Sequence, residues 1–66
     1  MNSYVSIEIA KGGYCWCIDF VSEGVCIDMD CDEIYTTKKG AIRGCKKWLK
    51  KIDLKAVWEH NGEAFN

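Results

Sequence analysis

Several features that would mark a membrane protein or an enzyme are missing from this 66-residue chain. No apolar run approaches the roughly 20 residues that cross a bilayer. The first residues, MNSY, lack the basic region and apolar core of a secretory signal peptide. His60 is the only histidine, and no cysteine, serine or aspartate is spaced with it as in a catalytic set. We therefore expect a cytoplasmic protein that is not an enzyme, has no cofactor and does not enter a membrane.

Repeats, low-complexity tracts and linker-like segments are also absent, and the length suits one small domain spanning residues 1–66. The five cysteines are an odd number without the spacing of a secreted disulfide scaffold, which predicts reduced thiols. A thiolate metal site is the alternative for four of them: Cys15, Cys17, Cys26 and Cys31. Their spacing is a poor match to zinc knuckles, so we expect half-buried thiols and no metal.

The net charge of −1 conceals a strong segregation of charge along the chain. Residues 1–37 contain seven acidic side chains and one lysine, whereas residues 38–55 contain eight basic side chains and one aspartate. The remaining residues, 56–66, carry two acidic side chains. Such a bipolar layout indicates interaction with a charged partner more than it indicates any fold.

Alternation of apolar and polar residues, typical of half-buried strands, occurs over 4–10, 14–20 and 25–31. A weaker alternation predicts at most a short fourth strand at 55–60. Residues 61–66 are expected to form a tail.

Two turns containing glycine set the expected register of these strands. Residues 12–13 are both glycine and suit a primed hairpin turn, which needs positive φ angles, and a second turn is expected at Ser22–Gly24. This register places Ile18 beside both Ile7 and Ile27. The two hairpins then share one apolar inner surface, made of Val5, Ile7, Ile9, Trp16, Ile18, Phe20, Val25, Ile27 and Met29.

The segment 37–51 has the periodicity of a surface helix, with Thr36 or Thr37 as its N-cap. Its basic residues lie on one side, and its apolar residues lie on the other side: Ala41, Ile42, Cys45, Trp48, Leu49 and Ile52. The predicted fold class is α+β, a three-stranded antiparallel β-meander packed on one α-helix.

The run Glu33-Ile-Tyr-Thr-Thr-Lys38, followed by Ala41 and Gly44, resembles the E-x-Y-[ST]-[ST]-K-x-x-A-x-x-G stretch of the YegP-like family of small bacterial domains. In that family the stretch joins the third strand to the helix of a three-stranded-sheet-plus-helix unit. The resemblance departs at the second turn, where the family usually has Asn-Gly. It implies a fold and no particular activity.

A weaker resemblance is to the C-terminal half of double-stranded-RNA-binding domains, in which a basic K-K-x-A motif opens the helix after a three-stranded sheet. Lys38-Lys39-Gly40-Ala41 matches this motif. The first helix of those domains has no counterpart here, because the chain starts directly in a predicted strand.

The outer face of the predicted sheet and the connection after it are acidic, through Glu8, Asp19, Asp28, Asp30 and Asp32. These residues are the first candidates for a partner-binding site. Like charges on neighbouring strands repel each other, and a basic partner would relieve the repulsion. We expect a small non-enzymatic interaction protein that binds a basic protein surface, such as a phage-type inhibitor of a nucleic-acid-handling or defence complex. Solvated polar alternation is the simpler explanation of the same pattern.

The alternative is a nucleic-acid-binding module that uses the basic side of the helix. Its candidate anion-binding residues are Thr37, Lys38, Lys39, Arg43, Lys46, Lys47 and Lys50. Lysines in a first helical turn oppose the helix dipole, which a bound phosphate would offset. A solvated helix face explains the same charges without a ligand.

A homodimer is a further hypothesis, because one chain carries both signs of charge. Gly40 and Gly44, one helical turn apart, permit close approach of another element to the helix. That element can come from the same chain or from a second copy, and a contact between helix sides is the dimer that we favour.

Overall fold

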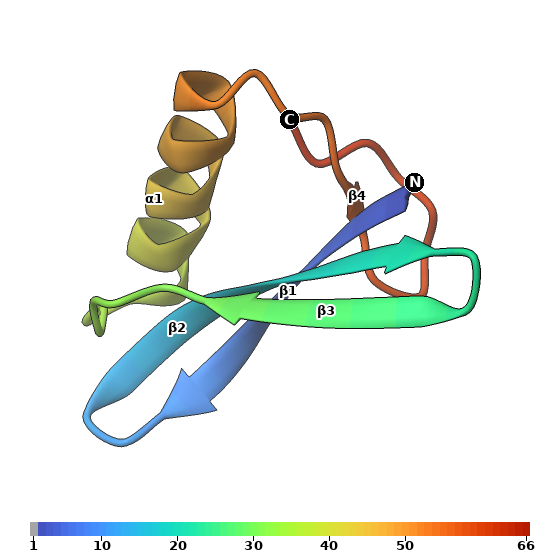
Figure 1. Ribbon diagram of the computed structural model, residues 1–66. Helices are drawn as coiled ribbons and strands as arrows, with labels where there is room; N and C mark the ends of the chain where they lie inside the picture. Colours follow the sequence, from blue (N-terminus) through green and yellow to red (C-terminus); the bar gives the residue numbers. More distant parts are fainter. Residues whose placement is uncertain (1) are drawn as a thin grey trace.

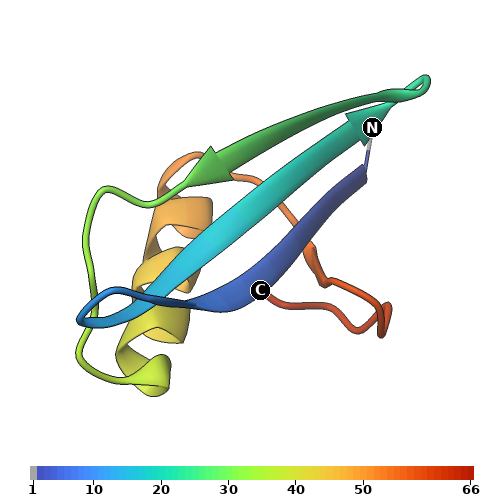
Figure 2. The same ribbon diagram turned by 90° about the horizontal axis from the view of Figure 1, so that it is seen from below.

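Four strands form one sheet in the order β3-β2-β1-β4, with a helix on one face (Figures 1 and 2). The computed structural model describes residues 2–66. Its elements in chain order are β1 (Asn2–Ala10), β2 (Gly13–Ser22), β3 (Val25–Asp30), α1 (Lys38–Lys51) and β4 (Val57–Trp58). The predicted α+β fold, with a three-stranded meander packed on a helix, is confirmed. Within residues 2–66 no helix combines the length and the apolar character needed to span a membrane.

The turn between β1 and β2 lies one residue earlier than predicted. It is formed by residues 11–12, of which the second has a φ of 91°. Gly13 already belongs to β2, and it must be glycine because a Cβ atom there would overlap the carbonyl oxygen of Tyr35. The predicted register is therefore wrong by two residues, and Ile18 faces Val5.

The turn between β2 and β3 has two residues, Glu23 and Gly24, with φ angles of 48° and 81°. Both angles are positive, as a primed hairpin turn requires. Ser22 was expected in this turn but pairs with Val25, so this register is also wrong by two residues. Because side chains alternate with a period of two, neither shift moves a residue to the other face of the sheet.

The core lies where α1 crosses β2 and β1. Val5 and Ile18 from the sheet and Leu49 from the helix are fully buried. The core cluster is completed by Trp16, Cys45, Ala56 and Phe65. The predicted burial of one helix side is confirmed along the middle of that side, where Ala41, Cys45 and Leu49 are all fully buried.

Parts of the predicted inner surface are exposed. Ile9, Val25 and Ile27 have exposed fractions of 87%, 59% and 61%, and Ile52 at the end of α1 is 45% exposed. Both hairpins extend beyond the helix (Figures 1 and 2). A 14-residue helix covers only the middle of this sheet, so these members of the predicted inner surface and of the apolar helix side are not buried.

Tyr35 joins the sheet to the start of α1. Its backbone exchanges two hydrogen bonds of 2.8 Å with Tyr14 on β2, and its ring packs over Gly40 and Gly44. The close approach that the two glycines permit is therefore made within the chain. The homodimer stays a prediction, without these glycines as evidence for it.

The C-terminal segment packs on the sheet. β4 pairs in parallel with β1. The predicted strand at 55–60 is therefore shorter than expected and contains only Val57 and Trp58. Phe65 is buried, with its ring edge-on to Trp58 at 4.5 Å between centroids, and its N–H donates to the carbonyl of Ala56. The predicted tail at 61–66 is wrong because this aromatic side chain closes one end of the core.

Candidate functional site

Four of the five predicted acidic site residues share the outer face of the sheet, opposite α1: Glu8, Asp19, Asp28 and Asp30. Glu8 on β1 and Asp30 on β3 flank Cys17 on β2, and the potential ligand atoms of the three side chains lie within 4.8 Å of one another. Burial strongly raises the pKa of the Cys17 thiol, and a hydrogen bond to Asp30 and the nearby carboxylates raise it further. This thiol stays protonated at neutral pH, so the charge of the face comes from its carboxylates.

Asp19 and Asp28 face each other directly across the β2–β3 pair. The pKa of Asp19 is raised to about 6, first by its hydrogen bond with Asp28, then by partial burial and by the negative charges of Asp28, Glu59 and Glu8. Two carboxyl groups this close ionise together only at a cost in free energy. A cation placed over them from outside would lower that cost.

Internal cations do not neutralise this face. Within residues 2–66 the only contact of 4.0 Å or less between a basic and an acidic side chain joins His60 Nε2 to Glu59 Oε1 at 3.2 Å. Every lysine and arginine of this part of the chain therefore lies more than 4.0 Å from a carboxylate. Both the acidic face and the basic helix are left available to external charges.

The residues that could contact a metal ion form two groups on this face, Glu8 with Cys17 and Asp30, and Asp19 with Cys26 and Asp28. Each group offers three donor atoms, and among the described residues neither group has the fourth ligand of a closed structural zinc site. Desolvation and Asp28 raise the pKa of the Cys26 thiol, which disfavours the thiolate that a metal requires. The absence of a resident metal stays a prediction.

Asp32 is the one predicted acidic residue that lies outside the strands. It belongs to the connection between β3 and α1, where it lines a hollow of about 760 Å³ together with Glu33. Arg43 and Lys47 of α1 line the same hollow, and its apolar lining includes the indole of Trp16. Asp30 of the acidic face also lines this hollow, so Asp32 differs from the other four in lying on the connection and not on a strand. No lysine or arginine of residues 2–66 lies within 4.0 Å of the Asp32 carboxylate.

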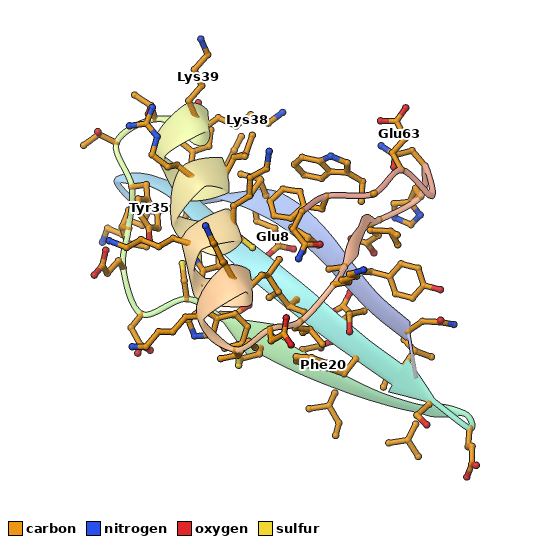
Figure 3. The ribbon with its side chains drawn as sticks, turned by 90° about the horizontal axis from the view of Figure 1, so that it is seen from above. Glu8, Phe20, Tyr35, Lys38, Lys39 and Glu63 are labelled. Atoms are coloured by element: carbon orange, nitrogen blue, oxygen red, sulfur yellow. The ribbon has the colours of Figure 1, made fainter. Side chains whose placement is uncertain are left out.

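The basic candidate side chains extend from α1 in several directions. Lys38 and Lys39 are exposed and extend from its first turn into solvent (Figure 3). Lys46 instead lies over the ring of Phe65, at 5.5 Å from the centroid, in a cation–π contact. The predicted N-cap is confirmed at Thr37, whose Oγ1 accepts the Gly40 N–H at 3.0 Å.

This cap satisfies one of the backbone donors that an anion would otherwise use, and it weakens the case for an anion site at the helix start. The remaining basic candidates do not converge on one point: Arg43 and Lys47 face the hollow, and Lys50 is exposed elsewhere on the helix.

One pair of residues was missed by the sequence analysis. Cys15 Sγ lies 2.8 Å from Cys31 Sγ, at the point where the chain leaves β3. Burial and the hydrogen bond to Cys31 raise the pKa of Cys15 to about 11. No spacing signal could have revealed the pair, because the contact depends on how the connection after β3 turns back over β2.

Comparisons with known proteins identify no relative. No protein-family model, no curated protein and no solved structure matches this chain. The resemblances to YegP-like domains and to double-stranded-RNA-binding domains therefore stay predictions.

Proposed function

We propose that this chain is a non-enzymatic interaction domain that binds a basic protein surface through the outer face of its sheet. The binding residues are Glu8, Asp19, Asp28 and Asp30. Asp32 is left out of the site because it lies on the connection after β3 and not on a strand of the sheet. The partner class that we favour is a nucleic-acid-handling or defence complex, since such complexes carry basic surfaces that an acidic, phage-type inhibitor can occupy.

The observation that carries this proposal is the uncompensated repulsion on the face. Asp19 and Asp28 are held opposite each other by the strand register, and no lysine or arginine of residues 2–66 is within 4.0 Å of either. A guanidinium or ammonium group from a partner would replace repulsion by attraction at no conformational cost to the sheet. Rigid strands also hold these carboxylates in place before binding, which limits the entropy lost on association.

Charge reversal on the sheet tests the proposal. Asp19→Lys with Asp28→Lys should abolish capture of a partner by the immobilised protein and lower the affinity of the purified partner at least about tenfold. The matched control is Glu23→Lys with Glu63→Lys, which changes net charge equally at two exposed positions away from the face. The control should retain binding, and equal losses in both double variants would contradict a specific face.

Nucleic-acid binding through α1 is the second candidate, supported by the unpaired cations of the helix and by the lack of acidic residues in its first turn. Lys46→Glu with Lys47→Glu should then abolish binding, whereas reversal of the two aspartates should not weaken it. Direct binding to duplex RNA or DNA that falls steeply between about 50 and 200 mM salt would favour this candidate over the first.

A further inference from the structure

The Sγ atoms of Cys15 and Cys31 are in direct contact. Their Sγ–Sγ distance of 2.8 Å is about 0.8 Å longer than the S–S bond of a disulfide, which is about 2.05 Å. Both residues are half-buried, so a small molecule can reach the pair from solvent. No other thiol pair of residues 2–66 makes such a contact.

We propose that Cys15 and Cys31 are a site of reversible oxidation, at which a low-molecular-weight disulfide of the glutathione type converts the two thiols into an intramolecular disulfide. The other cysteines are placed differently. Cys17 and Cys45 are buried, and Cys26 is exposed with Asp28 as its hydrogen-bond partner. Only this one pair therefore combines access with an adjacent second thiol.

The backbone holds the two thiols together before any bond forms. The Cys31 N–H donates to the carbonyl of Trp16 at 3.1 Å, which fixes the start of the connection beside β2. Four residues later, the paired hydrogen bonds between Tyr14 and Tyr35 fix its other end. Because the connection is anchored on both sides of the pair, oxidation needs no rearrangement of the sheet.

The reaction is ordinary thiol–disulfide exchange. One protein thiol loses its proton and attacks a sulfur of the small-molecule disulfide. The S–S bond of the small molecule breaks, a mixed disulfide forms with the protein, and the other half of the small molecule leaves as a thiol. The second protein thiol then attacks the mixed disulfide and expels the other small thiol. The two cysteines are oxidised by two electrons, and one small-molecule disulfide is reduced to two thiols, so atoms, protons and electrons balance.

The cross-link would fasten the connection after β3 to β2. That connection supplies Asp32 and Glu33, two of the three acidic residues that line the hollow beside α1, so oxidation would hold these two in place. The carboxylates of the acidic face take no part in the bond. The oxidation site therefore stands independently of the proposed function, and either can fail without the other.

The test is equilibration of the full-length native protein with mixtures of reduced and oxidised glutathione, followed by acid trapping and intact-mass measurement. The expected product has lost two hydrogens, and cleavage before aspartate residues should join the peptide that ends at Cys31 to the one that contains Cys15. Cys15→Ser and Cys31→Ser should each abolish this product. Cys17→Ser and Cys26→Ser should retain it, which separates Cys15 from its neighbour on β2 and Cys31 from its neighbour on β3.

A second measurement separates native geometry from general thiol reactivity. The equilibrium constant for the internal disulfide should fall at least about tenfold when the same titration is made in denaturing urea, because unfolding removes the proximity of the thiols. The proposal is overturned if the cross-link survives in Cys15→Ser, if both cysteines carry glutathione without joining, or if urea leaves the constant unchanged.

Discussion

The hydroxyl of Tyr35 occupies the space in which a Cβ atom of residue 44 would lie, so the ring of Tyr35 and Gly44 fit together only while position 44 is glycine. Alanine is favoured over glycine in a helix by about 1 kcal/mol, yet the added methyl group must displace a packed aromatic ring. We expect Gly44→Ala to lower the free energy of unfolding by about 1–3 kcal/mol in urea melts.

Gly40→Ala is the matched control, because a Cβ atom there would meet Tyr35 only at 3.7 Å and the Thr37 hydroxyl at 3.1 Å. Its helix-propensity gain should largely offset this milder crowding. A Gly44→Ala variant as stable as the Gly40→Ala variant would show that the Tyr35 ring can move without cost.

Ile18 and Ile27 should differ sharply in their contributions to stability, although the alternation of the sequence assigns both to the inner surface. Ile18 is fully buried, and Ile18→Ala should destabilise by about 2–5 kcal/mol. Ile27 is 61% exposed, so Ile27→Ala should cost less than about 1 kcal/mol. Similar losses in the two urea melts would mean that the β2–β3 hairpin is covered in solution.

Asp19 should make the protein more stable in mild acid than at neutral pH. Its pKa of about 6 lies above its ordinary value of 3.8, so the folded state binds this proton more tightly than the unfolded state does. Stability from this group is present at low pH and is lost as the pH rises through about 6.

Asp19→Asn should remove that dependence and raise stability at neutral pH by roughly 0.5 kcal/mol, a small effect because solvent screens this partly exposed site. Urea melts at about pH 5 and pH 7 measure the difference, with Glu63→Gln, at an exposed position outside the acidic face, as the control. An Asp19→Asn variant with the wild-type slope would mean that the proton is not shared at this position.

Phe65 should be a core residue despite its place at the second-to-last position. Its ring is 4% exposed and packs edge-on against Trp58. Phe65→Ala should therefore destabilise by about 3–5 kcal/mol, enough to unfold much of a small domain. Far-UV circular dichroism and a thermal melt measure the loss, whereas Glu63→Ala, two residues away and exposed, should change little.

Local periodicity was sufficient to predict the three long strands, the helix and the face of the sheet on which the strand side chains lie. Asp19 and Asp28 were placed correctly on the outer face even though both hairpin registers were predicted two residues away from their true positions. The reason is that the side-chain period of a strand is two, so an error of two residues changes the neighbours and preserves the face. Periodicity also predicted which side of the helix is buried, because the positions of Ala41 and Leu49 follow from the 3.6-residue period.

The tertiary structure decided how far the helix covers the sheet, and hence which apolar residues are buried. Ile9 and Ile27 have the same alternation as Ile18, but the two exposed residues lie beyond the reach of α1. Contacts between distant segments were likewise beyond the sequence. The docking of Phe65 and the Cys15–Cys31 contact each depend on where a connecting segment turns in space, and no local period encodes that path.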